Sequence, residues 1–328
     1  MSVFPDGLFQ YGGCPVGLDL FPALRKDAKV YFVDPASGSD SNSGLKPDNA
    51  LDTVAAAYAK TVSGQGDIVI LLGDGGTTGT ARDSAITWAN SNTHLVGVTA
   101  PAVNKRARIA PATTVTDVDA YTPYITLSGS GCVFANFSLF QGNSEDSKAS
   151  IGIKVSGSRN YITNVDVITG AHANQGDEES YSIQVTGSEN VVDSCYIGGD
   201  TWARGNNAVG CCVRFGSDAS DQSTRNIFRD CVFTMFADDT EPTFIYAKTA
   251  FDTDRWNLFK RCTFINTGTS TIDAAVKWSD TTGKLFLQDC AFYGMTDITA
   301  ADSSYVLMNS LASGTPVDAG HFKGVDVA

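Results

Sequence analysis

The sequence of 328 residues predicts an all-β fold, a single-stranded right-handed parallel β-helix of about eight or nine coils with an N-terminal capping helix and an extended N-terminal arm. Two series of apolar residues support this fold, because both recur with one period of about 30 residues, as in proteins whose units bury their faces only by stacking. Within each series apolar and polar residues alternate, which excludes helical repeats. A β-sandwich with coincidentally similar strands is the alternative.

Residues 1–29 form the expected arm. Its apolar side chains lie among Gly and Pro with no helical or alternating period, and they include Phe4, Leu8, Phe9, Tyr11 and Phe21. Such a segment cannot build a core of its own, so these side chains need the flank of the β-helix or a groove on another subunit. We therefore predict that residues 1–29 anchor the chain to a partner protein.

Residues 30–66 are expected to hold the first strand, at 31–33, and the capping helix, over about 49–61. Leu51, Val54, Ala55 and Tyr58 lie on one side of this helix, where they can cover the open end of a β-helix. Together with the loop "GSDSNSG" and the strand "DIVILLG", these elements resemble the N-terminal segment of pectin-lyase-like β-helix proteins. That group includes polysaccharide lyases, glycan hydrolases and phage tailspikes, so the resemblance implies a fold and no single activity.

The β-helix is predicted over residues 67–295, followed by a C-terminal cap or tail over 296–328. Its clearest unit, here called the coil motif, is "NIFRDCVF" at Asn226, and five relatives start at Cys132, Asn160, Asn190, Asn257 and Leu285. Positions four and five of the motif are polar and change the parity of the alternation, which predicts a corner. Asn recurs at position one, which we attribute to the left-handed backbone of a tight turn.

A second apolar series precedes each coil motif. Strands that return in one direction after about 30 residues can only pair in parallel, at the ordinary spacing of about 4.8 Å. The predicted inward pairs are Ile125/Leu127, Ile153/Val155, Ile183/Val185, Val213/Phe215, Ile245/Ala247 and Val276/Trp278.

Position six of the motif predicts an inward ladder of Cys195, Cys231, Cys262 and Cys290. Parallel Cβ vectors at the strand spacing keep the Cβ atoms beyond the roughly 3.8 Å that disulfides favour. We predict free, buried thiols that act as small apolar residues. Three His residues and no CxxC pair predict no metal site, and no cofactor is expected.

The composition limits the partners. A formal net charge of −13 argues against nucleic acid as a partner, because nucleic-acid binding relies on basic surfaces. No apolar run approaches the roughly 18 residues of a membrane span, so no membrane insertion is expected. The N-terminus has neither the basic nor the apolar region of a signal peptide, which predicts synthesis in a cytoplasm.

Carboxylates are the first candidates for chemistry, because glycan hydrolysis uses paired Asp or Glu residues with one kept protonated. Asp193 and Asp230 lie at the corners of successive coils, and further candidates in the loops are Glu178, Asp200, Asp238 and Asp239. No pair stands out, and acids at such places are also what a solvated surface shows. No Asp trio matches a calcium-dependent lyase.

Candidate contact residues are Trp202, in a loop, and the outward basic residues Lys154, Arg214 and Lys277. They would suit an acidic glycan or a partner protein, although Lys and Arg on an exposed strand also oppose aggregation. A loop Trp is more often a packing or interface residue than a catalytic platform.

These features favour a non-enzymatic bacteriophage virion structural protein, a capsid decoration or spike on the virion surface, made in the host cytoplasm. The arm would bind other virion proteins of the capsid or tail, and the chain would form a homo-trimer. The alternative is a tailspike-type polysaccharide depolymerase, either a glycoside hydrolase or a polysaccharide lyase. A third possibility is a module that binds a glycan or cell surface without cleaving it.

Overall fold

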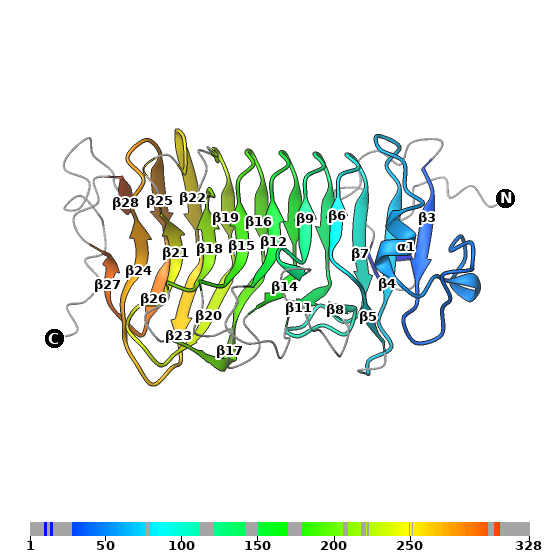
Figure 1. The fold of residues 1–328 in the computed structure, drawn as a ribbon, viewed down its shortest axis with the longest axis horizontal. Helices are drawn as coiled ribbons and strands as arrows, with labels where there is room; N and C mark the ends of the chain where they lie inside the picture. Colours follow the sequence, from blue (N-terminus) through cyan, green and yellow to red (C-terminus); the bar gives the residue numbers. More distant parts are fainter. Residues whose placement is uncertain are drawn as a thin grey trace.

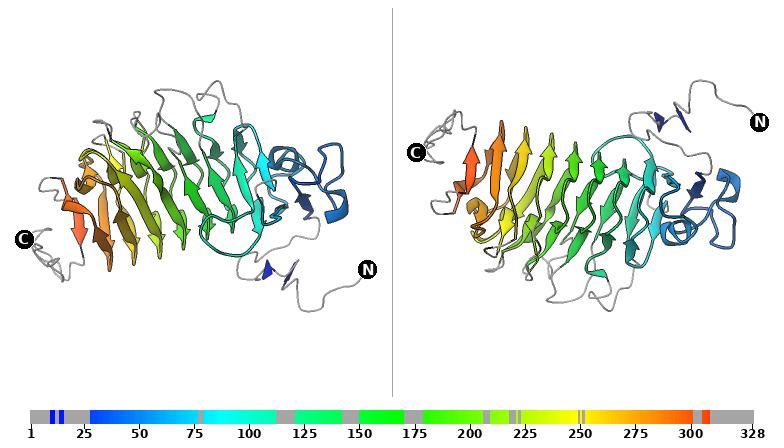
Figure 2. Two further views of the ribbon diagram at one scale, coloured as in Figure 1. Left: turned by 90° about the horizontal axis from the view of Figure 1, so that it is seen from below. Right: turned by 90° about the horizontal axis from the view of Figure 1, so that it is seen from above.

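The computed structural model describes residues 10–11, 14–15, 28–76, 79–111, 121–141, 150–169, 179–205, 209–217, 221, 223–248, 250, 252–300 and 305–308. The expected parallel β-helix is confirmed. The chain winds through three parallel sheets whose strands lie side by side along the long axis of the molecule (Figures 1 and 2). In the part of the chain that the structure describes, one sheet has ten strands and the other two have eight, so the coil count differs slightly from the eight or nine expected.

The ten-stranded sheet, called sheet 1, takes the first strand of each coil. In spatial order its strands are β3 (Val30–Val33), β4 (Ile68–Leu72), β7 (His94–Val98), β10 (Val133–Ala135), β13 (Tyr161–Thr163), β16 (Val191–Asp193), β19 (Ile227–Arg229), β22 (Trp256–Lys260), β25 (Lys284–Gln288) and β28 (Val306–Met308).

Sheet 2 takes the second strand of each coil. Its strands are β5 (Thr80–Arg82), β8 (Arg108–Ala110), β11 (Ser138–Phe140), β14 (Asp166–Ile168), β17 (Tyr196–Arg204), β20 (Val232–Ala237), β23 (Thr263–Asn266) and β26 (Ala291–Tyr293).

Sheet 3 closes each coil. Its strands are β6 (Ile86–Trp88), β9 (Ile125–Leu127), β12 (Ile151–Val155), β15 (Tyr181–Val185), β18 (Cys211–Phe215), β21 (Thr243–Ala247), β24 (Ile272–Trp278) and β27 (Met295–Thr299).

Of the N-terminal arm, the structure describes residues 28–29 and a short antiparallel pairing of β1 (Gln10–Tyr11) with β2 (Cys14–Pro15). The five arm side chains named above lie outside what the structure describes. Anchoring by residues 1–29 therefore stays a prediction. No helix among the described residues combines the length and the apolar character that crossing a membrane requires.

The interior follows the predicted alternation. All six inward pairs of the second series are buried, and the largest of them, Trp278, packs edge-on against Phe215 with ring centroids 5.6 Å apart. The coil motif adds columns of stacked rings, such as Phe228 on Phe259 at 4.5 Å. Equivalent residues on successive coils thus touch directly, which is how each coil buries its neighbour's apolar face.

The corner within the coil motif is confirmed. Position five has a positive φ in all six motifs, between 51° and 57°, at Asn136, Asn164, Ser194, Asp230, Arg261 and Asp289. The interpretation of position one is wrong. The left-handed residues at that turn precede the motif and include Arg159, Glu189 and Arg225, whereas the Asn residues serve another purpose.

The Asn side chains form a buried ladder inside the turn. Asn226 is 1% exposed, and its Oδ1 accepts hydrogen bonds from both the backbone N and Nδ2 of Asn190, each 3.0 Å long. Its Nδ2 donates to the carbonyl of Gly187 at 3.1 Å and to Oδ1 of Asn257 at 2.9 Å. Asn190 and Asn160 repeat the pattern one and two coils earlier, so each amide ties three successive coils together.

The capping helix is present and shorter than expected. A 3₁₀ turn, η1 (Pro47–Asn49), precedes α1 (Val54–Tyr58). Leu51, Val54 and Ala57 are fully buried, and the ring of Tyr58 lies 4.5 Å from that of Trp88. The helix therefore covers the N-terminal end of the core, as predicted, with Ala57 rather than Ala55 as its buried alanine.

Asp83, at the corner after β5, caps this helix from the next coil. Its carboxylate accepts hydrogen bonds from the backbone N of Val54 at 3.1 Å and of Ala55 at 2.9 Å. The residue is 2% exposed, and burial outweighs these bonds and raises its pKa to about 6.

The raised pKa of Asp83 predicts a pH dependence of stability. The folded protein holds this proton more tightly than the unfolded chain, whose Asp pKa is near 3.8, so the free energy of unfolding falls as pH rises from about 4 to 6. At about 1.4 kcal/mol per pKa unit the loss is about 3 kcal/mol. Urea unfolding of the wild type and of Asp83→Asn should show that the difference between their free energies of unfolding changes by that amount across this pH range. Asp48→Asn, at an exposed acid, is the control, and a constant difference for Asp83→Asn would contradict the prediction.

Candidate functional site

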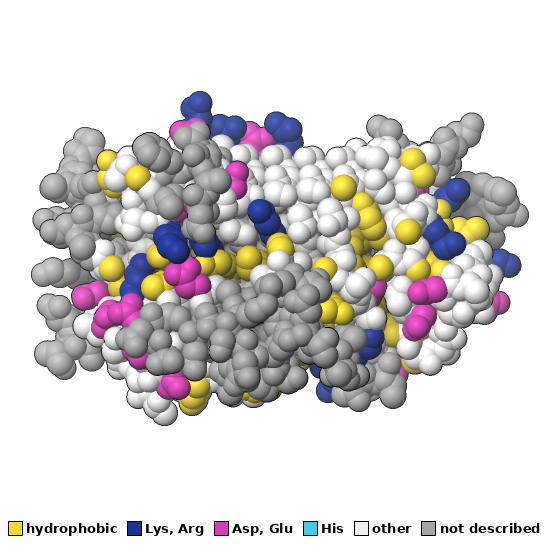
Figure 3. All heavy atoms as spheres, in the orientation of Figure 1, with side chains coloured by type: hydrophobic (Ala, Val, Ile, Leu, Met, Phe, Trp, Pro, Cys, Tyr) yellow, Lys and Arg dark blue, Asp and Glu magenta, His cyan; other side chains and the backbone are white. Residues whose placement is uncertain are grey.

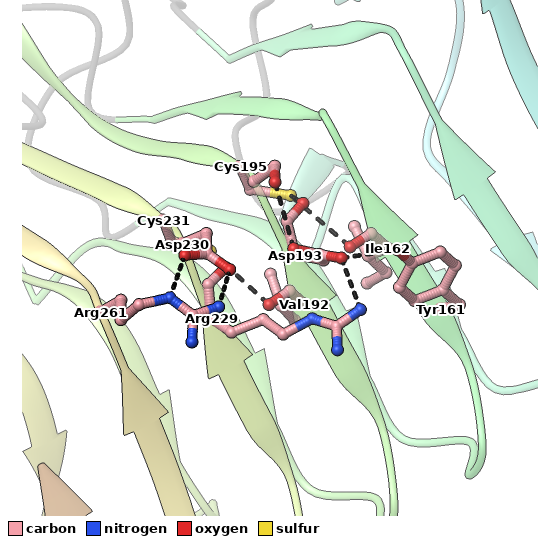
Figure 4. A network of polar contacts seen from close by, with 10 residues as sticks. Tyr161, Ile162, Val192, Asp193, Cys195, Arg229, Asp230, Cys231 and Arg261 are labelled. Carbon is pink, nitrogen blue, oxygen red and sulfur yellow. Dashed lines mark hydrogen bonds and ion pairs between the residues drawn. The ribbon is translucent and has the colours of Figure 1, made fainter. Parts of the chain in front are cut away.

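Asp193, one of the two corner carboxylates, lies on the outer face of sheet 1 at the end of β16. Its Oδ2 accepts hydrogen bonds from Tyr161 Oη at 2.6 Å and Arg229 Nη2 at 2.7 Å, from the coils on either side (Figure 4). Burial by itself raises the pKa of Asp193, but these bonds to the charged form outweigh it and hold the pKa below its usual value.

Asp230, the other corner carboxylate, faces Arg261 on the next coil. The two make a bidentate pair, with Nε to Oδ1 at 2.7 Å and Nη2 to Oδ2 at 2.6 Å (Figure 4). The hydrogen bonds from Arg261 lower the pKa of Asp230. Because both corner carboxylates are held ionised by arginines, neither is poised as the protonated acid that glycoside hydrolysis needs.

The loop carboxylates are not brought together into a recognisable pair. Asp200 and Asp238 are exposed and Asp239 is half-buried, while Glu178 lies outside the described residues. Asp238 packs its side chain over Gly205 and pairs its backbone N with the carbonyl of Arg204 at 3.0 Å. Trp202 is half-buried, and its ring packs edge-on against Phe140 with centroids 5.9 Å apart.

Arg204, which the sequence did not single out, fixes the bases of these loops. Its side chain is 2% exposed and donates to the carbonyls of Thr169 at 2.9 Å, Ser180 at 3.3 Å and Cys211 at 3.4 Å. These acceptors bound the loops that separate sheet 2 from sheet 3. No local pattern marks an arginine as buried, so only the tertiary structure identifies it.

The basic residues predicted to face outward on sheet 3 do so, in one register column with Gln184 and Tyr246. Arg214, however, is only 4% exposed: its Nη1 donates to Tyr181 Oη at 2.5 Å, and its guanidinium carbon lies 4.9 Å from the centre of that ring. Tyr181 Oη in turn donates to Glu179 at 2.9 Å. Arg214 therefore belongs to a packed network rather than to an open basic surface.

The remaining members of the column differ from Arg214. Lys277 pairs with Glu241 at 2.8 Å, and Lys154 is half-buried. On the face drawn in Figure 3, hydrophobic side chains form a band across the middle of the molecule, and charged side chains of both signs adjoin it in the C-terminal half.

Tyr246 lies beside Arg214 in the same column. Burial raises the pKa of Tyr246 to about 12. Its hydroxyl is therefore neutral at physiological pH and acts through hydrogen bonds.

A buried ion pair lies on sheet 2 and was also missed from the sequence. Lys105 Nζ is 2.7 Å from Asp166 Oδ1, and the two side chains are 2% and 1% exposed. Asp166 Oδ2 accepts a second bond from Ser138 Oγ at 2.6 Å and a third from the backbone N of Lys105 at 3.1 Å. The pair clamps the connection between β7 and β8 onto a strand two coils further along.

The cysteines of the motif stack in one interior column. Cys195, Cys231 and Cys262 are at most 2% exposed, and Cys290 is half-buried at the C-terminal end. Each thiol faces backbone carbonyls; that of Cys231, for example, donates to Arg229 at 3.2 Å and to Val192 on the preceding coil at 3.6 Å. Burial raises the pKa of Cys231 well above its usual value, which makes it a poor nucleophile at neutral pH.

Free thiols can be tested by native alkylation followed by mass spectrometry. We expect iodoacetamide to modify Cys290 in the folded protein and to reach Cys195, Cys231 and Cys262 only after unfolding, because Cys290 is the one of these four that is more than 2% exposed. Alkylation in denaturant of unreduced protein is the control that counts all thiols. A Cys195–Cys231 or Cys231–Cys262 disulfide peptide from unreduced protein would contradict the prediction.

Among the residues that the structure describes, no three His, Cys, Asp or Glu side chains come together as metal ligands would. No protein-family model matches the sequence, and no curated protein matches it.

Solved structures with the same fold do match. Pectin methylesterase PemA from Erwinia chrysanthemi aligns at 12% identity over 87% of this chain and 89% of its own, with a TM-score of 0.56. Pectate lyase Pel9A aligns at 15% identity over 83% of this chain and 66% of its own, with a TM-score of 0.53. Tailspike protein 2 from an Escherichia coli O157:H7 bacteriophage aligns at 9% identity over 87% and 43%, with a TM-score of 0.40, too low to bear on the role of this chain.

The first two matches show that the chain has the pectin-lyase-like parallel β-helix fold, as the resemblance of its N-terminal segment implies. At identities this low they show the fold alone.

Proposed function

We propose that the chain is a non-enzymatic structural protein of a bacteriophage virion, a capsid decoration or spike that residues 1–29 attach to other virion proteins. The observation that supports a structural role is the pairing of Asp193 with Arg229 and of Asp230 with Arg261. These carboxylates, the catalytic candidates at the corners, join one coil to the next instead of standing ready for proton transfer.

Two further features support the virion setting. The seven cysteines whose side chains the structure describes are free, as is usual for proteins that fold in a reducing cytoplasm, where phage particles are assembled. The arm combines apolar and aromatic residues with Gly and Pro, a composition that suits docking onto another protein. A homo-trimer on the virion surface belongs to the same proposal.

Deletion of residues 1–29 tests the attachment. Mass spectrometry of purified particles should find the full chain and not the truncated one, although the truncated chain should fold with the same circular dichroism spectrum. A truncated protein that joins particles at the wild-type level would overturn anchoring by the arm.

Incubation with bacterial surface polysaccharides tests the absence of catalysis. We expect no release of reducing ends or unsaturated ends above that of the Asp193→Asn/Asp230→Asn double variant. Activity that the wild type shows and the variant lacks would establish a depolymerase, and saturable binding without product would instead identify a glycan-binding module.

A further inference from the structure

A row of apolar side chains that the described residues leave partly uncovered runs along the outer face of sheet 1. Its members occupy one register column on six successive strands, from β13 to β28, and we call them the apolar stripe: Tyr161, Val191, Ile227, Leu258, Phe286 and Leu307. Phe286 is 36% exposed and the other five are half-buried. A continuous apolar row of this length on an outer face is typical of an interaction surface.

The same column is covered in the first coils. Ile68, His94 and Val133 occupy it on β4, β7 and β10, and they are only 3%, 8% and 8% exposed. Ile68 and Val133 pack in a cluster that includes Ala50, from the segment after η1. The outer face of sheet 1 is thus built to be covered, and from β13 onward the described residues of this chain leave it partly open.

Four acids beside the stripe are paired with arginines of the same chain. Five arginines pair there with four carboxylates, whereas the whole chain carries a formal net charge of −13. Two acidic molecules repel each other through most of their surfaces, and least through a face where the acids are already paired. The pairs are Arg159 and Arg225 with Glu189, Arg229 with Asp193, Arg255 with Asp254, and Arg261 with Asp230.

The spacing of the stripe identifies what can cover it. Its side chains follow one another at the strand spacing of about 4.8 Å, so six of them extend over roughly 24 Å. An extended peptide, such as the arm, places a side chain on one face about every 6.8 Å. Its side chains therefore lose register with those of the stripe within two or three residues. A second β-helix of the same kind repeats at the matching interval.

We propose that the apolar stripe packs side by side against the apolar stripe of another copy of this chain. A rotation axis that runs parallel to the stripes and close to them then brings identical residues together on every coil, as in closed symmetric oligomers. This self-association rests on the stripe and its paired charges, and it does not depend on the role in a virion.

A charge placed on the stripe tests the proposal in the full-length protein. Phe286→Lys should weaken self-association about tenfold or more in sedimentation velocity at micromolar concentrations, because it places an unpaired cation in the apolar contact. Val232→Lys is the matched control: Val232 is also 36% exposed but lies on sheet 2, on β20. Its oligomer should match the wild type.

A cross-link keeps the test decisive if Phe286→Lys does not fold. Ile227→Cys should give a disulfide-linked dimer under mild oxidation, visible on a non-reducing gel, and Val232→Cys should not. The proposal is overturned by a monomeric wild type, by Ile227→Cys that forms no more dimer than Val232→Cys, or by an oligomer that survives Phe286→Lys and is lost when residues 1–29 are deleted, which would make the arm responsible for assembly.

Discussion

Replacement of Lys105 by methionine is expected to lower the free energy of unfolding by about 3–5 kcal/mol. The change leaves the Asp166 carboxylate in a site that is 1% exposed, with the Ser138 hydroxyl and one backbone N–H as its remaining described partners. An ionised carboxylate without its counter-ion is among the most costly groups to bury. Denaturant unfolding, followed by circular dichroism, measures the loss.

The double variant Lys105→Met/Asp166→Leu separates the charge from the packing. If the cost of Lys105→Met comes from the unpaired carboxylate, removal of both charges should restore most of the lost stability, since apolar replacements of buried ion pairs are often neutral. Lys154→Met, at a half-buried lysine on β12, is the control and should change stability by about 0.5 kcal/mol or less. A loss below about 1 kcal/mol for Lys105→Met would mean that water reaches Asp166.

Replacement of Asn226 by alanine is expected to cost about 3 kcal/mol or more, because several buried groups lose their partners at once. The backbone N and Nδ2 of Asn190 lose their acceptor, and the carbonyl of Gly187 loses a donor. Each unsatisfied buried group costs about 1–3 kcal/mol. The melting temperature and the denaturation midpoint should both fall.

Asn226→Leu distinguishes hydrogen bonding from volume. Leucine fills the space and occurs naturally at this place in the last motif, where Leu285 lies in register with Asn257. If the hydrogen bonds dominate, Asn226→Leu should remain nearly as destabilised as Asn226→Ala. Gln288→Ala, at an exposed residue on β25, is the control. If Asn226→Leu is as stable as this control, packing rather than hydrogen bonding accounts for the contribution of the ladder.

The sequence was sufficient for the coil itself. Side-chain direction along a strand is a local property with period 2, so the repeat could assign the inward pairs, the cysteine column and the corner at position five. The capping helix could be located for a similar reason, since Leu51, Val54 and Tyr58 show their shared face within a few residues.

The contacts between coils could not be derived in this way. Asn at position one suggested a left-handed turn on local propensity alone, whereas stacking placed its amide in the interior, where the next coil supplies its partner. By their residue type and position, Asp193 and Asp230 were candidate catalytic acids. In the structure each of them pairs with an arginine one coil away, Arg229 and Arg261 respectively.

What the sequence alone determined is the period of the chain, and with it the fold and the residues that face inward. What only the tertiary structure decided is which outward and polar side chains meet, as in the pairing of Lys105 with Asp166 and in the apolar stripe. Those partners lie about 30 to 60 residues apart across loops of unequal length. Their meeting depends on the stacking register of whole coils, which no local pattern of residues encodes.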